Sequence, residues 1–155
     1  MKADAKPTSL YHSDFVHWVQ MTVEQLRSHA YAEVDWANLI EEIEDMSRRE
    51  RKALRSNLRI LLLHLLKWQY QSEHRSGSWK SSIREHRQRI HDDLDDSPSL
   101  RPYLTEILHD CYVKARLLAA DETELAKTVF PAQLPYSVEQ ILDGDFLPEA
   151  EPDQD

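Results

Sequence analysis

Apolar side chains recur every three or four residues along most of this 155-residue chain, which is the period of an amphipathic helix. No run shows the alternation typical of strands. We therefore predict an all-α fold: a single-domain bundle of four to five helices, with a short C-terminal helix and a wrapped, proline-rich tail. The pattern places the helices over about residues 13–29, 36–46, 48–71, 78–95, 98–121 and 138–142.

The longest apolar run, Ile60–Leu66, predicts the centre of the bundle. It is apolar on every side except at His64, and a helix that is apolar all round is surrounded by protein. The fifth predicted helix should face the same core with one stripe: Leu100, Leu104, Ile107, Leu108, Cys111, Ala115 and Leu118.

A possible helix start lies in the middle of the longest helical pattern. Ser47 opens the sequence Ser-Arg-Arg-Glu, which has the form of a capping box, because Glu50 can reach back to the Ser47 amide. We therefore predict a break or bend near Ser47, with one helix before it and another after it. A single continuous helix is the alternative.

Other short polar side chains mark the remaining helix starts. Ser13 or Asp14 can cap the first helix, and Asp35 the second. Ser78 can cap the fourth, and Ser97 can cap the fifth, which then has a proline at its first position. Between these signals we expect one helical domain over residues 13–148. A flexible arm over 1–12 should precede it and a disordered acidic tail over 149–155 should follow it.

The charges are unevenly distributed along the chain. The formal net charge is −9, but residues 47–91 alone carry 12 Lys or Arg against 3 Asp or Glu. The segments on either side are acidic, with net charges of −6 and −12. A basic middle between acidic ends can neutralise itself within the folded chain, which we favour, or present a basic face to an anionic partner.

Composition excludes several classes of function. Two glycines are too few for a phosphate-binding loop or a dinucleotide fingerprint. The single cysteine, Cys111, cannot form an internal disulfide or a thiolate metal cluster. The N-terminus lacks the apolar core of a signal peptide, and no apolar run is long enough to cross a bilayer. We therefore expect a cytoplasmic protein that does not contact the membrane.

Several blocks of the chain resemble one bacterial family. These blocks are LIEEIEDM at residues 39–46, RRERKALRSNLRILLLHLLKWQYQ at 48–71 and RSGSWKSSIREHRQRI at 75–90. The first and last segments of residues 10–148, LYHSDFVHWVQ and FPAQLPYSVEQILDGDFLP, resemble the same family. The chain is similar to the family known only as domain of unknown function twenty-nine. The resemblance implies a largely helical single-domain protein and supplies no activity. The positions that match its polar and aromatic pattern are Asn38, Glu41, Glu42, Glu44, His64, Lys67, Trp68, Arg75, Trp79 and Glu85.

His64 is the first candidate for chemistry. A buried imidazole needs hydrogen-bond partners. With Glu41 or Glu44 from the preceding helix, His64 would form a metal site or act as a general base in a metal-dependent enzyme. The alternative, which we favour, is a core histidine that holds two helices in register. A di-iron site is disfavoured, because only one Glu-x-x-His motif exists, at Glu106 and His109.

A second candidate is the basic, aromatic-rich face of residues 67–84. Cations beside exposed rings suit phosphate or single-stranded nucleic acid. Together with the first candidate, the candidate ligand-binding residues are His64, Glu41, Glu44, Lys67, Trp68, Arg75, Trp79 and Arg84. No nucleic-acid motif accompanies them, so we consider nucleic acid the less favoured partner.

No catalytic signature is present, and we assign no catalytic residue, metal or cofactor. The serines lie in caps and turns, and Cys111 falls on a core stripe. The favoured hypothesis is a non-enzymatic helical module that acts through a protein partner or through self-association.

Overall fold

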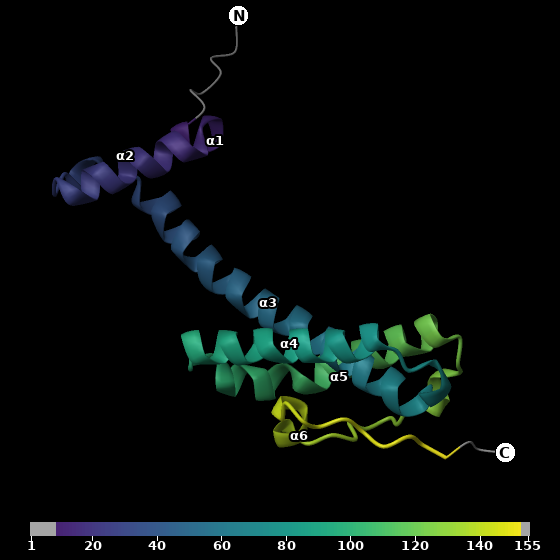
Figure 1. Cartoon of the computed structure of the whole chain (residues 1–155). Coiled ribbons are helices and arrows are strands. Elements are labelled where there is room, and N and C mark those ends of the chain that lie inside the picture. Colours follow the sequence, from purple (N-terminus) through teal and green to yellow (C-terminus); the bar gives the residue numbers. More distant parts are fainter. Residues whose placement is uncertain (1–8, 153–155) are drawn as a thin grey trace, which may run out of the picture. The chain divides into compact units, whose positions relative to one another are not determined.

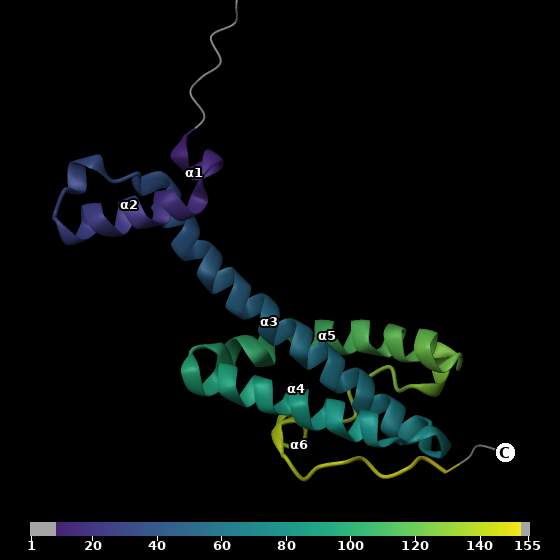
Figure 2. The same cartoon turned by 45° about the horizontal axis from the view of Figure 1, so that its top comes forward.

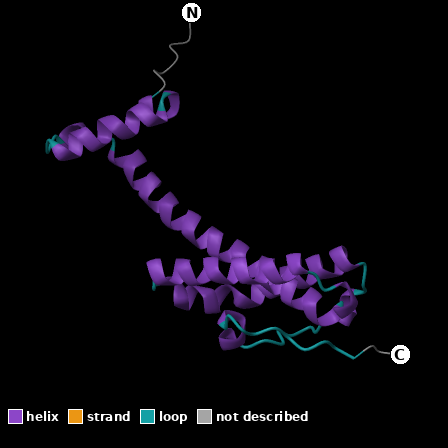
Figure 3. Cartoon of the chain, viewed as in Figure 1, coloured by secondary structure: helices purple, strands orange, loops and turns teal. Residues whose placement is uncertain are grey.

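The computed structural model describes residues 9–152, and within this range every regular element is helical (Figures 1 and 3). The all-α prediction is confirmed. The described residues form four long helices and two short ones, with 3-10 turns at Tyr31–Glu33, Ser72–His74 and Lys127–Val129. The helices are α1 (Leu10–Ser13), α2 (Phe15–Arg27), α3 (Trp36–Tyr70), α4 (Gly77–Asp96), α5 (Leu100–Thr123) and α6 (Val138–Leu142).

Residue contacts divide the chain into two compact units, Met1–Arg48 and Arg49–Asp155. We call them the N-terminal unit and the C-terminal unit. Helix α3 contributes residues to both. Most of the predicted arm, and the last three residues of the predicted tail, lie outside the described residues.

The predicted break near Ser47 is wrong, because α3 continues through it as one helix of 35 residues. A capping box at Ser47 would start a new helix there, whereas the ion pairs of Arg48 need a helix that continues through Ser47. Arg48 pairs with Glu41 at 2.9 Å, with Glu44 at 3.7 Å and with Asp45. These partners lie one and two turns earlier on the same helix, where the helical repeat brings side chains together.

Two predicted caps are confirmed, both in the N-terminal unit. The Asp14 carboxylate accepts a hydrogen bond from the His17 amide at 3.0 Å and caps α2. The Asp35 carboxylate accepts from the Asn38 amide at 3.3 Å at the start of α3.

The other two predicted caps are wrong: the α4 cap lies two residues earlier, and at the start of α5 Ser99 makes no side-chain capping hydrogen bond. Helix α4 is capped by Ser76, whose hydroxyl accepts from the Trp79 amide, while Ser78 lies inside the helix. Helix α5 starts at Leu100 after Ser99, and Ser97 instead ends α4. Several serines lie near each of these helix starts and carry the same hydroxyl group. The sequence alone therefore could not show which serine precedes the first helical residue.

The C-terminal unit contains the main core. Figure 2 shows the C-terminal part of α3 lying between α4 and α5, and side chains from all three helices share one buried cluster. The predicted centre is confirmed, since Leu61, Leu62, Leu63, Leu65 and Leu66 are all buried.

One member of the predicted α5 stripe is misplaced. Leu118 is 37% exposed, whereas Ala119 is fully buried. The buried face follows a spacing of four residues from Cys111 through Ala115 to Ala119. Around the helix, Leu118 lies about 60° from Ala115 and about 100° from Ala119, toward the edge of that face.

The C-terminal segment wraps along the C-terminal unit and is held by a buried arginine. The Arg87 guanidinium donates through Nε to the Ile141 carbonyl at 2.8 Å. Its other two nitrogens donate to the Gly144 carbonyl at 3.4 Å and the Phe146 carbonyl at 3.1 Å. His91 Nε2 lies 2.6 Å from the Leu142 carbonyl. Two side chains of α4 thus satisfy the backbone of a segment that has little regular structure of its own.

Asp93, near the C-terminal end of α4, is unfavourably placed. Its Oδ2 is buried without a hydrogen-bond partner among the described residues. Burial, followed by the carboxylates of Glu50, Asp92 and Asp96, raises the pKa of Asp93. A negative charge in the last turn of a helix also opposes the helix dipole.

We therefore predict that Asp93→Asn stabilises the protein at pH 7, by about 0.5–1 kcal/mol. The raised folded-state pKa means that ionisation costs folding free energy as pH rises through the interval between the unfolded and folded values. The cost persists at pH 7. Thermal melts should show a higher Tm at pH 7 and no gain near pH 3, where the carboxyl is neutral in both states. Asp110→Asn, on an exposed face of α5, is the control; an equal gain there would contradict the prediction.

Candidate functional site

His64 does not join two helices as we expected. Its side chain is half-buried, and Nδ1 lies 2.9 Å from the Ile60 carbonyl oxygen one turn earlier in α3. The proposed pairing with Glu41 or Glu44 assumed that the chain turns back near Ser47, and α3 has no such turn. Within residues 9–152, no group of three or more His, Cys, Asp or Glu side chains is arranged to hold a metal ion.

Lys67 and Trp79, two residues of the predicted 67–84 face, contact each other. The buried Lys67 Nζ lies 4.5 Å from the centre of the Trp79 ring and 2.8 Å from the Glu122 carboxylate. The ring and the carboxylate together balance a charge that would otherwise be costly to bury.

Arg75 and Trp68, two further residues of this face, also contact each other. The Arg75 guanidinium lies 4.7 Å from the Trp68 ring centre, and its Nε donates to the Trp68 carbonyl at 2.8 Å. A second nitrogen donates to the Pro148 carbonyl at 3.5 Å. These contacts tie the end of α3 to the C-terminal segment. Four of the five predicted residues on this face therefore have intramolecular partners.

Arg84 is the fifth residue, and it remains exposed. It lines two depressions together with Lys80, and one of them, of about 170 Å³, also involves Arg87 and Asp145. No hydrogen bond or ion pair engages the Lys80 or Arg84 side chain within the described part of the chain. These two cations are what remains of the predicted polyanion surface.

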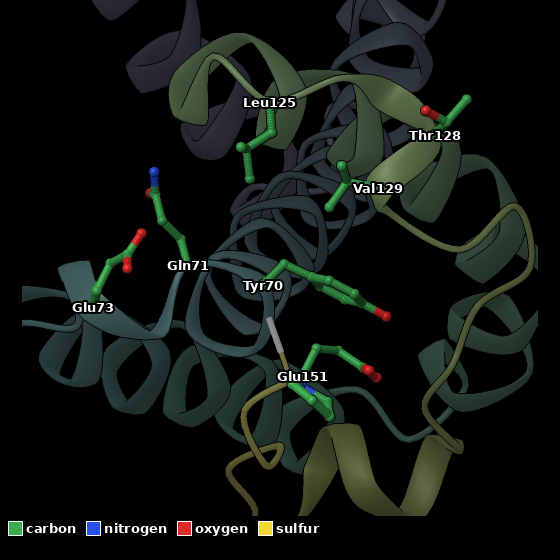
Figure 4. A pocket seen from close by; sticks show the side chains of 8 residues that line it. Tyr70, Gln71, Glu73, Leu125, Thr128, Val129 and Glu151 are labelled. Atoms are coloured by element: carbon green, nitrogen blue, oxygen red, sulfur yellow. The ribbon is translucent and has the colours of Figure 1, made fainter. Parts of the chain in front are cut away.

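A larger cavity, of about 290 Å³, opens where α3 ends (Figure 4). Its wall combines an aromatic ring, two carboxylates and apolar side chains, and contains no Lys or Arg. Burial, with a smaller effect of the nearby Glu151 carboxylate, raises the pKa of the Tyr70 hydroxyl. The wall therefore suits ligands that donate hydrogen bonds better than anions. It is lined by Tyr70, Gln71, Glu73, Leu125, Thr128, Val129, Glu151 and Pro152.

Sequence reasoning missed most of this cavity. Tyr70 and Gln71 come from the end of the helix predicted over residues 48–71, but the opposite wall comes from residues 125–129 and 151–152. The Glu151 amide donates to the Gln69 carbonyl at 3.0 Å, and Gln69 donates back to the Glu151 carboxylate at 3.1 Å. Nothing local in the sequence signals that these distant segments meet.

The largest concentration of exposed apolar side chains lies in the N-terminal unit. Ten of the 14 exposed large apolar residues in the described chain belong to it, although only two of the 23 buried ones do. Its small interior is formed by Trp18, Thr22 and Val34, with Tyr11 packed edge-on against Trp18. The Tyr11 hydroxyl donates to Glu42 at 2.6 Å, a contact that raises the pKa of Tyr11 to about 12.

Helix α3 carries the clearest part of this surface. No side chain of α3 before Leu54 is buried. The uncovered part bears a line of large apolar residues at helical spacing, with exposures of 47%, 53%, 57% and 61%. We call this line the α3 stripe: Trp36, Ile40, Ile43 and Met46. These positions lie in the helix predicted over residues 36–46, but periodicity alone could not show whether they are buried.

These features define a helical protein with one well-packed unit and one unit that leaves apolar surface open. The profile of the family described as "Domain of unknown function DUF29" matches residues 10–147, nearly the whole chain, and the chain belongs to that family. No curated protein and no solved structure matches it. Within the described residues, no helix is both long enough and apolar enough to span a membrane.

Proposed function

We propose that this protein is a non-enzymatic interaction module that associates with a second copy of itself through the α3 stripe. The observation that carries the proposal is the absence of buried side chains in α3 before Leu54. Helices in proteins are stabilised mainly by packing of an apolar face, and exposed apolar patches mark interaction surfaces. A partner helix would supply the missing packing.

The energy available from the stripe is adequate for association. Covering a large apolar side chain completely is worth about 1.5–3 kcal/mol. The four stripe residues are about half exposed, so each copy would gain about 3–6 kcal/mol. Two copies contribute, and the total is comparable with the cost of association, about 4–15 kcal/mol. Micromolar affinity is therefore the tightest that we expect.

Charge supports a second copy as the partner. Residues 1–46 carry a net charge of −6 and residues 47–91 carry +9, so one chain contains both halves of a complementary pair. Electrostatic complementarity of this kind favours encounter and orientation more than affinity.

Fewer side chains support the two alternative hypotheses, polyanion binding and a metal-dependent enzyme. Polyanion binding by the 67–84 face would depend on Lys80 and Arg84, because Lys67 and Arg75 are engaged within the chain. A metal-dependent enzyme centred on His64 would need ligands beyond the Ile60 carbonyl beside it.

Sedimentation velocity of the full chain tests the proposal. We expect an assembly heavier than the 18.3 kDa monomer at tens of micromolar. Ile40→Glu combined with Ile43→Glu should produce a monomer, because two charges cannot be buried in an apolar contact.

The matched control is Val113→Glu combined with Leu117→Glu, on an exposed apolar part of α5. It changes the charge equally and should leave the assembly intact. Circular dichroism should show that both double variants stay helical. A wild-type monomer at every concentration, or equal behaviour of the two double variants, would disprove the proposal.

A further inference from the structure

The cavity at the end of α3 is formed by the C-terminal unit alone, because every residue that lines it follows position 48. Its volume of about 290 Å³ is close to the lower end of the range for ligand sites, about 300–1,000 Å³. A ligand of this cavity is therefore small. Two carboxylates, those of Glu73 and Glu151, belong to the wall, and no Lys or Arg among the described residues lines it.

The chain that supplies one wall of the cavity is acidic as a whole. Residues 121–152 carry eight Asp or Glu against one Lys, a net charge of −7. One of these acids, Glu122, pairs with Lys67 of α3. A segment with such an excess of one sign raises the local concentration of oppositely charged ligands. The cavity therefore favours a cation over an anion.

Glu151 is held at the wall by contacts that leave one of its carboxylate oxygens available. Its amide donates to the Gln69 carbonyl at 3.0 Å, and the Gln69 side chain donates to Glu151 Oε1 at 3.1 Å. Gln69 is fixed in turn by the buried Tyr136, whose hydroxyl donates to Gln69 Oε1 at 2.6 Å. The second oxygen, Glu151 Oε2, accepts no hydrogen bond from the part of the chain that the structure describes.

Glu73 is the second carboxylate, and in Figure 4 it lies apart from Glu151, on another side of the Tyr70 side chain. It belongs to the 3-10 turn that follows α3. Its neighbour His74 has Nδ1 at 3.8 Å from Glu73 Oε1, and both side chains are exposed. An exposed pair at this distance contributes little, so Glu73 stays open to another partner.

Tyr70 adds an aromatic ring to the wall. The ring is held in an edge-to-face contact with the fully buried Phe130, with the two ring centres 5.4 Å apart. The face of such a ring attracts a positive charge. Leu125 and Val129 add apolar surface to the same cavity. Apolar surface gains from contact with methylene groups, so the wall suits an organic cation better than an inorganic one.

We propose that this cavity binds a small aliphatic diamine, with one ammonium group at Glu73 and the other at Glu151. Each ammonium group donates a charge-assisted hydrogen bond to its carboxylate. The methylene chain between them lies against the Tyr70 ring and the apolar part of the wall. The site needs no residue of the N-terminal unit, so it is independent of the proposed self-association.

A two-dimensional NMR titration of the full chain with 1,4-diaminobutane tests the proposal, at about 0.15 M salt to screen weak surface attraction. We expect saturable shifts at the amides of residues 70–73, 125–129 and 151, with a Kd of about 1 mM. 1-Aminobutane should bind about tenfold more weakly, because it leaves one carboxylate without a charged partner. Glutarate, a dianion with a similar methylene chain, should cause no saturable shift at these amides.

Glu73→Gln combined with Glu151→Gln should abolish the binding of 1,4-diaminobutane, and each single change should weaken it about tenfold. The matched control is Glu106→Gln combined with Glu139→Gln, which removes two exposed carboxylates that do not line the cavity. It should leave Kd unchanged, and circular dichroism should show that all variants stay helical. Three outcomes would overturn the diamine site: no saturable shift at about ten times the expected Kd, equal affinity for 1-aminobutane, or equal weakening in the control. Sedimentation of the wild type decides self-association separately.

Discussion

Replacing Arg87 with Met is expected to lower the free energy of unfolding by about 3 kcal/mol. The side chain is buried, and its guanidinium donates to three carbonyls of the C-terminal segment. Methionine keeps most of the apolar stem but donates nothing, so the carbonyls of Ile141, Gly144 and Phe146 lose their donors. Hydrogen bonds from a charged group are each worth about 1.5–3 kcal/mol, and water will replace part of the loss.

Chemical denaturation and thermal melts measure the effect. For a chain of this length, Tm should fall by about 6–12 °C. Hydrogen exchange should locate the loss at the amides of residues 141–147, because these residues are held by Arg87. Arg87→Lys should retain only part of the stability that Arg87→Met loses, since a single ammonium group cannot span three acceptors.

Arg89→Met is the matched control for Arg87→Met. Arg89 lies on the exposed side of the same helix and pairs with Glu85 at 2.9 Å, one turn earlier. Losing such a pair costs about 0.2–0.5 kcal/mol. Similar losses in the two variants would show that Arg87 does not hold the C-terminal segment.

Local patterns predicted the parts of the fold that local physics decides. The run Ile60–Leu66 had to be buried, because its apolar surface points in every direction. Asp14 and Asp35 were correctly predicted as caps. A carboxylate just before an amphipathic helix accepts a hydrogen bond from a backbone amide in the first turn that has no partner within the helix. At Ser47 two local signals disagreed, and the ion pairs of Arg48 accompany a helix that continues.

The candidate site depended on contacts that the sequence could not reveal. Lys67 is balanced by Glu122, 55 residues away, and Arg75 by the backbone of Pro148. The tertiary fold alone creates these partners. Because of these partners, Lys67 and Arg75 bond within the chain and do not form the cationic surface that we predicted. The α3 stripe presented the opposite difficulty, because periodicity shows that an apolar face exists but not whether the chain covers it.

Arg48→Pro is expected to unfold the N-terminal part of α3. Proline inside a helix removes one hydrogen bond, clashes with the carbonyl four residues earlier, and costs about 3 kcal/mol or more. Residues 36–47 would then form a helix of three turns, which is marginal in isolation. Circular dichroism should show reduced ellipticity at 222 nm, and hydrogen exchange should accelerate in residues 36–47.

The same substitution has the opposite outcome if a helix starts at Ser47. Proline is favoured at the first helical position after a serine cap, so Arg48→Pro would then leave the helix content unchanged. Arg48→Ala is the control, because it removes the pairs with Glu41, Glu44 and Asp45 and keeps a good helix former. We expect full helix content in Arg48→Ala. Loss of the N-terminal part of α3 should also abolish self-association in Arg48→Pro, since the α3 stripe lies on that part of the helix.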